Sequence, residues 1–321
     1  MVNGKMNILV SGSVAYDRIM DFPGKFSDHI LPEKIHMLNV CFMINELKEN
    51  FGGTAGNIAY ALSLLGETPK IIATSGRDFE PYKKWLEDHK IPTRHIKMID
   101  EELTAGAYIT TDQSDNQITA FNPGAMKYSA WFDFDAAAKE ASLAIVSPGN
   151  LNDMMQFSKI YKQKGIEYIF DPGQSLPAWS KEHLMEAIDG AKIFICNDYE
   201  FQLTQDKTSM TNEDIIRGTD ILIITKGEFG STIICGENGT TKTYDVPAAK
   251  VSVVKDPTGA GDAYRAGLIK GLVAGKGIVH AAKIGAVCAA YAVEVYGTQN
   301  FHFTADEFKV RFKEVFKESP F

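Results

Sequence analysis

The sequence is poor in cysteine and has no long hydrophobic run. Its four cysteines, among 321 residues, lie far apart, and none shows the paired spacing of a zinc site. We therefore expect reduced thiols in the core, at Cys41, Cys196, Cys235 and Cys288. No stretch approaches the roughly 18 to 20 apolar residues of a membrane span, and residues 1–5 form no signal-peptide core. Together these absences predict a cytoplasmic protein.

Positive charge is also scarce. The chain has 33 Lys and Arg against 41 Asp and Glu, and its net charge is -8 with a pI near 5.5. Such a chain is poorly suited to bind a nucleic-acid backbone or an anionic membrane. If it binds a phosphate, backbone dipoles and a divalent metal must supply the positive field. With 45% hydrophobic residues, the composition is that of a globular protein with a large core.

Motifs of several common enzyme classes are missing. G-x-x-x-x-G-K-[ST] does not occur, which excludes an ordinary P-loop. The dinucleotide fingerprint G-x-G-x-x-G fails because Tyr264 stands where the third glycine of a motif beginning at Gly259 would be. A dehydrogenase is therefore disfavoured. G-x-S-x-G and H-E-x-x-H are absent too, so a serine hydrolase or a zinc protease has no support.

Strand-like and helix-like segments alternate over most of the chain, which predicts an α/β fold with a mainly parallel sheet covered on both faces. We expect strands at 7–13, 70–74, 142–147, 167–171, 192–196 and 220–225, and helices at 79–89, 150–164, 180–188, 198–204, 261–274, 278–295 and 304–317. Strands near 231–235 and 240–246 are expected to be antiparallel. Residues 14–50 and 103–123 lack long helices, and we interpret them as a small β-sheet lid within a single domain, residues 1–321.

A turn of small residues opens the helix at 261–274. Gly259, Ala260 and Gly261 allow backbone N–H groups to approach an anion at the positive end of this helix. Asp262 is out of place there, because a carboxylate repels a phosphate. We therefore interpret Asp262 as the acceptor of a proton from a group that attacks a phosphate. The alternative is that Asp262 only caps the helix.

A second glycine turn precedes a helix that ends at Gly66. Gly52 and Gly53 let a ligand approach the backbone, and Asn57 lies in the first helical turn, where its polar side chain would face that ligand. The alternative is a helix entry with a capping role. Asp17 follows the first strand near its carboxyl end, the edge at which open α/β sheets bind ligands.

These two segments resemble the two signatures of the ribokinase-like (PfkB) family of sugar and nucleoside kinases. Two further segments follow in the family's order: Asn197–Glu200 resembles the N-x-x-E magnesium motif, and Thr225–Gly230 resembles the glycine turn on the nucleotide side. The resemblance covers nearly the whole chain. It implies a three-layer αβα core with a β lid, and phosphoryl transfer from ATP to a hydroxyl group.

The resemblance also implies a role for each matching residue. Asp262 would be the general base, and Gly259, Ala260 and Gly261 would stabilise the transferring phosphoryl group. The nucleoside would be bound by Ser13, Asp17, Gly52, Gly53, Asn57 and Phe121. The nucleotide would contact Asn197, Lys226, Gly227, Gly230 and Thr258, and Mg²⁺ would be held by Asn197 and Glu200, mostly through water. Asp256 and Thr258 resemble positions that bind a monovalent cation in some members of the family.

Five segments are similar to the bacterial adenosine kinase branch of the family: 12–17, 22–26, 116–121, 170–174 and 296–299. This similarity implies adenosine as the acceptor, AMP as the product and a place in purine salvage. Lid side chains suited to stack on a purine are Phe42, Met43, Tyr108 and Phe121, unless they pack in the lid's own core.

Several alternatives stay open. The acceptor could be another nucleoside or a free sugar such as ribose or fructose, and a non-catalytic purine or sugar sensor could keep the same fold. Arg265 could reach a phosphate or pair with a carboxylate. The lid strands would suit either a monomer or a homodimer that pairs through the lid.

Overall fold

A nine-stranded sheet forms the centre of the molecule. The computed structural model describes residues 7–30, 36–37, 39–114, 116–137, 142–237 and 240–321. The strand order is β13-β12-β11-β10-β9-β8-β1-β4-β5, parallel from β11 to β5 and antiparallel at β12 and β13. The strands are β1 Asn7–Ser11, β4 Lys70–Gly76, β5 Ile96–Ile99, β8 Ser142–Val146, β9 Glu167–Phe170, β10 Ile193–Asn197, β11 Ile221–Thr225, β12 Ser231–Glu237 and β13 Thr240–Val246.

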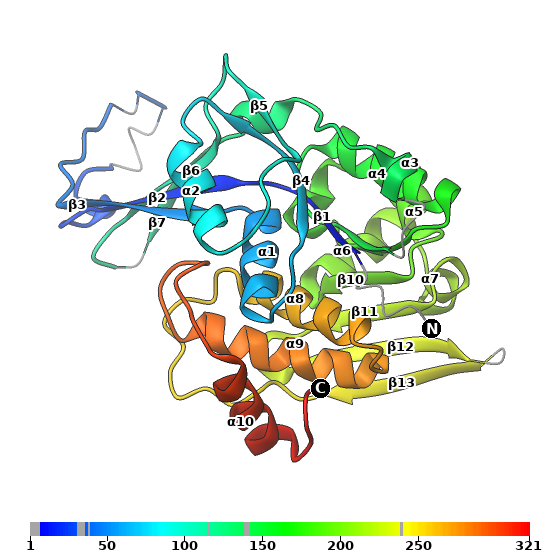
Figure 1. The fold of residues 1–321 in the computed structure, drawn as a ribbon. Helices are drawn as coiled ribbons and strands as arrows, with labels where there is room; N and C mark the ends of the chain where they lie inside the picture. The colour runs from blue at the N-terminus through cyan, green and yellow to red at the C-terminus, as the bar shows by residue number, and fades with distance from the viewer. Residues whose placement is uncertain (1–6, 31–35, 38, 115, 138–141, 238–239) are drawn as a thin grey trace.

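Helices cover both faces of this sheet, as Figure 1 shows. Alternate residues of β1 supply the two apolar layers: Ile8 and Val10 pack in one cluster and Leu9 in the other. The first layer includes α1 Thr54–Leu64, α2 Glu80–Asp88, α8 Ala260–Val273, α9 Ile278–Val293 and α10 Ala305–Phe316. The second includes α3 Phe134–Ala137, α4 Leu151–Lys164, α5 Lys181–Ile188, α6 Asp198–Thr208 and α7 Asn212–Gly218. The predicted three-layer α/β core is therefore confirmed.

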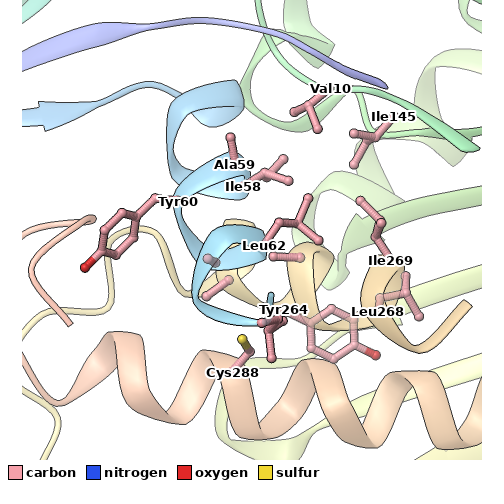
Figure 2. Packing of buried hydrophobic residues seen from close by; sticks show 14 of the residues in the cluster. Val10, Ile58, Ala59, Tyr60, Leu62, Ile145, Tyr264, Leu268, Ile269 and Cys288 are labelled. Atoms are coloured by element: carbon pink, nitrogen blue, oxygen red, sulfur yellow. The ribbon is translucent and has the colours of Figure 1, made fainter. Parts of the chain in front are cut away.

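Helix α1 packs beside α8, and both helices begin at the site described below. Figure 2 shows Ile58 and Leu62 of α1 between the sheet residues Val10 and Ile145 on one side and Leu268 of α8 on the other. The next helix, α9, lies very close to α8. A Cβ on Gly267 would come within 2.7 Å of the Gly285 Cα, so the close approach requires glycine.

A separate four-stranded sheet projects from the core (Figure 1). Its order is β3-β2-β6-β7, formed by β3 Glu46–Gly52, β2 Ala15–Asp21, β6 Ala105–Thr111 and β7 Gln117–Asn122. Strand β2 pairs in parallel with β6 and antiparallel with β3. Every residue of β7 is exposed, so this sheet, which we call the lid sheet, has little core of its own. The predicted separate small sheet is confirmed.

Some local features differ from the sequence predictions. Strand β5 and helix α7 were not expected. Of the four cysteines, all of which are free, Cys196, Cys235 and Cys288 are buried, but Cys41 is exposed, so the prediction of a core thiol is wrong there. Among the described residues, no helix combines the length and the apolar character needed to cross a membrane.

Candidate active site

The carboxyl ends of the parallel strands β1, β8, β9, β10 and β11 meet at one edge of the main sheet. Polar residues lie at the ends of these strands or directly after them, including Ser13, Ser147, Asp171, Asn197 and Thr225. The helices α1 and α8 also begin at this edge, with Gly53 and Gly259 as their N-caps. The fold therefore gathers segments that are distant in sequence at the edge where open α/β sheets bind ligands.

The N-terminus of α8 is open to an anion. Gly259 adopts the left-handed conformation with φ of 78°, which glycine adopts without strain. Ala260 donates its N–H to the Pro257 carbonyl at 3.3 Å, and the first helical bond runs from the Ala263 N–H to the Gly259 carbonyl at 2.9 Å. The N–H groups of Gly261 and Asp262 precede that first bond and have no acceptor within the helix. Unpaired N–H groups at the start of a helix are the donors that an anion can use.

Asp262 lies in the first turn of α8 and contacts α1 directly. Its Oδ2 accepts a hydrogen bond from the Asn57 Nδ2 at 2.8 Å. Desolvation by the surrounding protein raises the pKa of the Asp262 carboxyl to about 7, against the opposing effects of the Asn57 hydrogen bond and the Arg265 charge. A carboxyl group with a pKa near neutrality is suited to accept a proton at physiological pH.

The N-terminus of α1 is closed, in contrast to that of α8. The Thr54 N–H donates to the Ser13 hydroxyl at 3.0 Å, and the Ala55 N–H donates to the Ser13 carbonyl at 3.0 Å. Ser13 therefore satisfies the first turn of α1 from outside the helix. This leaves α8 as the helix of the pair whose N-terminal amides can meet a phosphate.

The glycine pair before α1 lies very close to the lid strand β2. A Cβ on Gly53, whose φ is 85°, would lie 2.6 Å from the Ser13 carbonyl oxygen. A Cβ on Gly52 would lie 2.4 Å from the Asp17 Oδ2. The backbone at Gly53 therefore needs glycine, whereas a side chain at position 52 would displace the Asp17 carboxylate.

Asp17 presents an open carboxylate. Desolvation, and next the charge of Asp256, raise its pKa to about 6. Within the part of the chain that the structure describes, we find no hydrogen bond to its side chain. The register of the lid sheet aligns Asp17 with Ala107 and Ala107 with Phe121, so Asp17 and Phe121 share one face of the lid sheet.

The other aromatic candidates of the lid lie elsewhere. Tyr108 is one position away from Ala107 and therefore lies on the face of the lid sheet opposite to Asp17, where its hydroxyl accepts a hydrogen bond from Arg18 at 3.1 Å. Phe42 packs against Phe22 and Phe26, as expected if it belongs to the lid's own core. Phe121 and Met43 are largely exposed, at 53% and 85%.

The predicted nucleotide side lies at the ends of β10 and β11, where Asn197 aligns with Thr225. The turn that follows has positive φ at Gly227, 54°, and at Gly230, 83°. A Cβ on Gly227 would meet nothing within 4 Å, whereas one on Gly230 would collide with the Val246 carbonyl. Lys226 donates from Nζ to the Thr232 hydroxyl at 2.6 Å.

Asn197 and Glu200 form a capping box at the start of α6, which was the structural alternative to a magnesium role. The Glu200 N–H donates to the Asn197 Oδ1 at 2.7 Å, and the Asn197 N–H donates to the Glu200 Oε2 at 2.8 Å. The Glu200 Oε1 is not used in this box. Among the described residues, no three His, Cys, Asp or Glu side chains form a metal-binding group. The structure therefore shows the capping role of Asn197 and Glu200 at the start of α6.

Asp256 organises the loop before α8. Its two carboxylate oxygens accept from the Thr258 N–H at 2.9 Å and from the Gly297 N–H at 3.0 Å. The segments that contain Thr258 and Gly297 are thus joined at the entrance to the glycine turn. Both carboxylate oxygens of Asp256 accept hydrogen bonds from backbone N–H groups, so this side chain holds the two segments together.

Arg265 forms a buried ion pair with Asp171. Its Nη2 donates to the Asp171 Oδ1 at 2.8 Å, and its Nε contacts Oδ2. The guanidinium lies directly beneath the glycine turn, because a Cβ on Gly261 would come within 2.8 Å of the Arg265 Nη1. The sequence left open whether Arg265 contacts a phosphate or a carboxylate, and in the structure it pairs with a carboxylate.

Sequence reasoning missed the contacts that Gln299 and Tyr82 make beside Asn57. The Gln299 Nε2 donates to the Asn57 Oδ1 at 3.0 Å and to the Tyr82 hydroxyl at 2.6 Å. Gln299 lies within the segment 296–299 that carried the resemblance to adenosine kinases, but no pattern in the sequence indicated that it contacts Asn57.

Comparison with solved structures identifies similar folds. The Burkholderia thailandensis nucleoside kinase in complex with inosine has a TM-score of 0.82 and 35% identity, covering 97% of this chain and 99% of that chain. The nucleoside kinase of Methanocaldococcus jannaschii has a TM-score of 0.84 and 30% identity, covering 97% and 100%. In a sequence comparison, a nucleoside kinase from the same archaeon is 32% identical over 270 residues, which are 83% of this chain and 87% of that protein.

The family model described as pfkB family carbohydrate kinase matches residues 25–304. This match spans both signature segments, the β10 and β11 turns and most of the lid sheet. The phosphotransferase predicted from the sequence is confirmed. The chain belongs to the pfkB family of carbohydrate kinases, within the ribokinase-like fold.

Proposed function

We propose that this protein is an ATP-dependent nucleoside kinase that phosphorylates the 5′-hydroxyl of a purine nucleoside. The observation that carries the proposal is the position of Asp262. It lies at the open N-terminus of α8, is hydrogen-bonded to Asn57 and has a pKa raised to about 7. A base and an anion-binding helix end thus occupy the same turn.

The proposed reaction uses the two sides of this turn. Asp262 takes the proton of the 5′-hydroxyl as its oxygen forms a bond to the γ-phosphorus of ATP, and the bond from that phosphorus to the oxygen of ADP breaks. The N–H groups of Gly261 and Asp262 stabilise the transferring phosphoryl group. A hydrated Mg²⁺ beside Glu200 would neutralise phosphate charge. Asp262 then releases its proton to water.

On the acceptor side, Asp17 would bind the ribose hydroxyls. Its open carboxylate can accept two vicinal O–H groups, and Gly52 and Gly53 leave room beside it. Phe121, on the same face of the lid sheet, is suited to stack on the base. Closure of the lid over the bound nucleoside would exclude water and limit hydrolysis of ATP.

Adenosine is the acceptor that the sequence favours, with AMP as the product. Inosine is the second candidate, because a relative 35% identical to this chain has been solved in complex with inosine. Mg-ATP-dependent formation of ADP should be measured with adenosine, inosine, guanosine, cytidine, ribose and fructose, and the products identified by mass spectrometry. We expect the highest kcat/KM with a purine nucleoside. Higher values with free ribose or fructose would refute the proposal, and nucleoside binding without any product would indicate a sensor.

A further inference from the structure

A chain of hydrogen-bonded side chains connects α2 to the catalytic aspartate. Its members come from four separate segments of the sequence, and the central ones, Asn57, Tyr82 and Gln299, are all buried. Trp85 donates from Nε1 to the Gln299 Oε1 at 3.0 Å. Gln299 in turn donates to Asn57 and Tyr82, and Asn57 donates to Asp262. The arrangement therefore couples a residue of α2 to the proposed base through two amides.

Trp85 fixes the direction of this chain. An indole N–H can only donate a hydrogen bond, so the amide oxygen of Gln299 must face Trp85. The amide nitrogen of Gln299 must then face the other way, toward the Asn57 Oδ1 at 3.0 Å. The orientation of the Gln299 amide is thus set by chemistry rather than by a free choice between two similar rotamers.

Tyr82 imposes the same orientation from the other side. Its hydroxyl donates to the Gly52 carbonyl at 2.8 Å, and a carbonyl can only accept. The hydroxyl oxygen is left to accept a hydrogen bond, which it receives from the Gln299 Nε2 at 2.6 Å. An inverted Gln299 would place oxygens against both Asn57 and Tyr82 and leave the indole N–H of Trp85 without an acceptor.

The orientation of Gln299 determines which atom of Asn57 faces Asp262. Because the Asn57 Oδ1 is occupied by Gln299, Nδ2 is the Asn57 atom that faces the aspartate, 2.8 Å from its Oδ2. This donor stabilises the ionised carboxylate. It also occupies one of the two carboxylate oxygens, which leaves Oδ1 to receive a proton from the acceptor.

We propose that Gln299, oriented by Trp85 and Tyr82, is a positioning residue that holds the Asn57 amide as a donor to Asp262 and so keeps the base ionised and aligned. This inference rests on the proposed function only for its effect on catalysis. The hydrogen-bond chain itself can be tested without any substrate.

Of the charged or titratable groups around the base, Tyr82 is the one that Gln299 contacts, and its hydroxyl can keep its bond to the Gly52 carbonyl when Gln299 is changed. These groups come from each element packed around Asp262: Asp17 on β2, Tyr82 on α2, Asp171 after β9 and Arg265 on α8. A shift in the titration of Asp262 in a Gln299 variant therefore reports on the donor supplied by Asn57.

The direct test is Gln299→Met, which keeps a similar volume but removes every hydrogen bond of the amide. Carboxyl ¹³C NMR of aspartate-labelled protein, with Asp262→Asn to assign the signal, gives the titration midpoint of Asp262. We expect Gln299→Met to raise this midpoint by about 0.5 to 1 unit, because Asn57 is free to rotate and its donor to the carboxylate is lost. Trp85→Phe should raise it less, since it removes only the N–H that orients Gln299.

Tyr60→Phe is the matched control. The Tyr60 hydroxyl donates to the Phe301 carbonyl at 2.6 Å and so anchors the same C-terminal segment without touching Asp262. It should lower stability comparably to Trp85→Phe but leave the titration midpoint unchanged.

In the active enzyme, the acid limb of the kcat profile of Gln299→Met should move to higher pH by the same amount, so that activity recovers at alkaline pH. A midpoint within about 0.2 units of the wild type, or an equal shift in Tyr60→Phe, would overturn the inference. If no acceptor is phosphorylated at all, the NMR result still stands or fails independently of the proposed function.

Discussion

The proposed role of Asp262 as a base conflicts with the stability of the folded protein. In an unfolded chain an aspartate titrates near pH 4, but here desolvation raises the pKa to about 7. The folded protein therefore binds a proton more tightly than the unfolded chain between these values. The contribution of Asp262 to stability is fully present below about pH 4 and is lost as the pH rises through 7.

Asp262→Asn should separate these two effects. The amide cannot accept the hydroxyl proton, so we expect kcat to fall by about 10² to 10⁴, with nucleoside binding largely retained. The amide also cannot ionise, so above pH 7 the variant should be more stable than the wild type, by roughly 2 to 6 °C in Tm. Below pH 5 the difference should shrink. Steady-state kinetics measures the fall in kcat, and thermal unfolding at pH 5 and pH 8 measures the change in Tm. Normal turnover by the variant would exclude Asp262 as the base.

A change at Asp17 should affect the KM for the nucleoside, whereas a change at Asp262 affects kcat. Its carboxylate is the proposed acceptor for two ribose hydroxyls, so Asp17→Asn should raise KM for the nucleoside by about 10- to 100-fold and change KM for ATP much less. Since its pKa is raised to about 6, nucleoside KM of the wild type should also increase as the pH falls below 6. Steady-state kinetics with each substrate varied in turn measures this. Equal weakening of both substrates would place Asp17 outside the acceptor site.

At the scale of elements, the site depends on two helix ends with opposite properties. Ser13 closes the N-terminus of α1, which makes this helix a rigid support for Asn57. The N-terminus of α8 stays open above the Arg265 and Asp171 pair. Because Asp171 neutralises Arg265, the positive field at this end comes from the unpaired N–H groups of the first turn.

Breaking the buried ion pair between Arg265 and Asp171 should strongly destabilise the fold. Asp171→Asn leaves the buried Arg265 guanidinium without a counter-charge and should lower the free energy of unfolding by about 3 to 5 kcal/mol. The matched control is Glu186→Gln, which breaks the exposed pair with Lys159 at 3.4 Å and should cost less than about 1 kcal/mol. Urea unfolding of both variants beside the wild type tests this. Similar small losses in the two variants would mean that Arg265 finds another partner.

The elements that the sequence predicted best are those with continuous apolar runs. Strands such as β10 and β11 are buried on both faces, and their sequence pattern shows it. Strand β5 was missed because it is four residues long and half exposed. Helix α7 was missed because it has only seven residues and one buried side chain. Short, partly exposed elements leave little periodicity in a sequence.

The sequence predicted which segments form the candidate site, but not the contacts between them. The glycine turns and Asp262 were recognisable from local chemistry and from the resemblance. The contact between Asn57 and Asp262 joins residues 205 positions apart, and that between Trp85 and Gln299 joins residues 214 positions apart. No local pattern encodes such pairs, because they depend on how α1, α2, α8 and the C-terminal segment pack.

At the scale of the whole molecule, the protein combines a deeply buried core sheet with a thin lid sheet. The two faces of the core sheet are covered by helices, whereas in the lid sheet every residue of β7 and four residues of β3 are exposed. A four-stranded sheet with so little burial is only marginally stable. We therefore expect the lid sheet to open locally far more often than the core and to gain stability from its ligand.

Hydrogen exchange should show this difference directly. A nucleoside at about 100 times its Kd stabilises the segments it closes by up to about 2.7 kcal/mol, so amides of β2, β6 and β7 should exchange up to ~100-fold more slowly. Core strands such as β1 and β8 should change little, and Asp17→Asn should reduce the slowing at the same concentration to about 2- to 10-fold, because its weaker binding leaves the nucleoside at only about 1 to 10 times the variant's Kd. Pairing of lid sheets between two copies would instead protect the edge strands β3 and β7 in a way that depends on protein concentration and not on nucleoside. Uniform slowing across both sheets would contradict a ligand-closed lid, because it would mean that lid and core open as one unit.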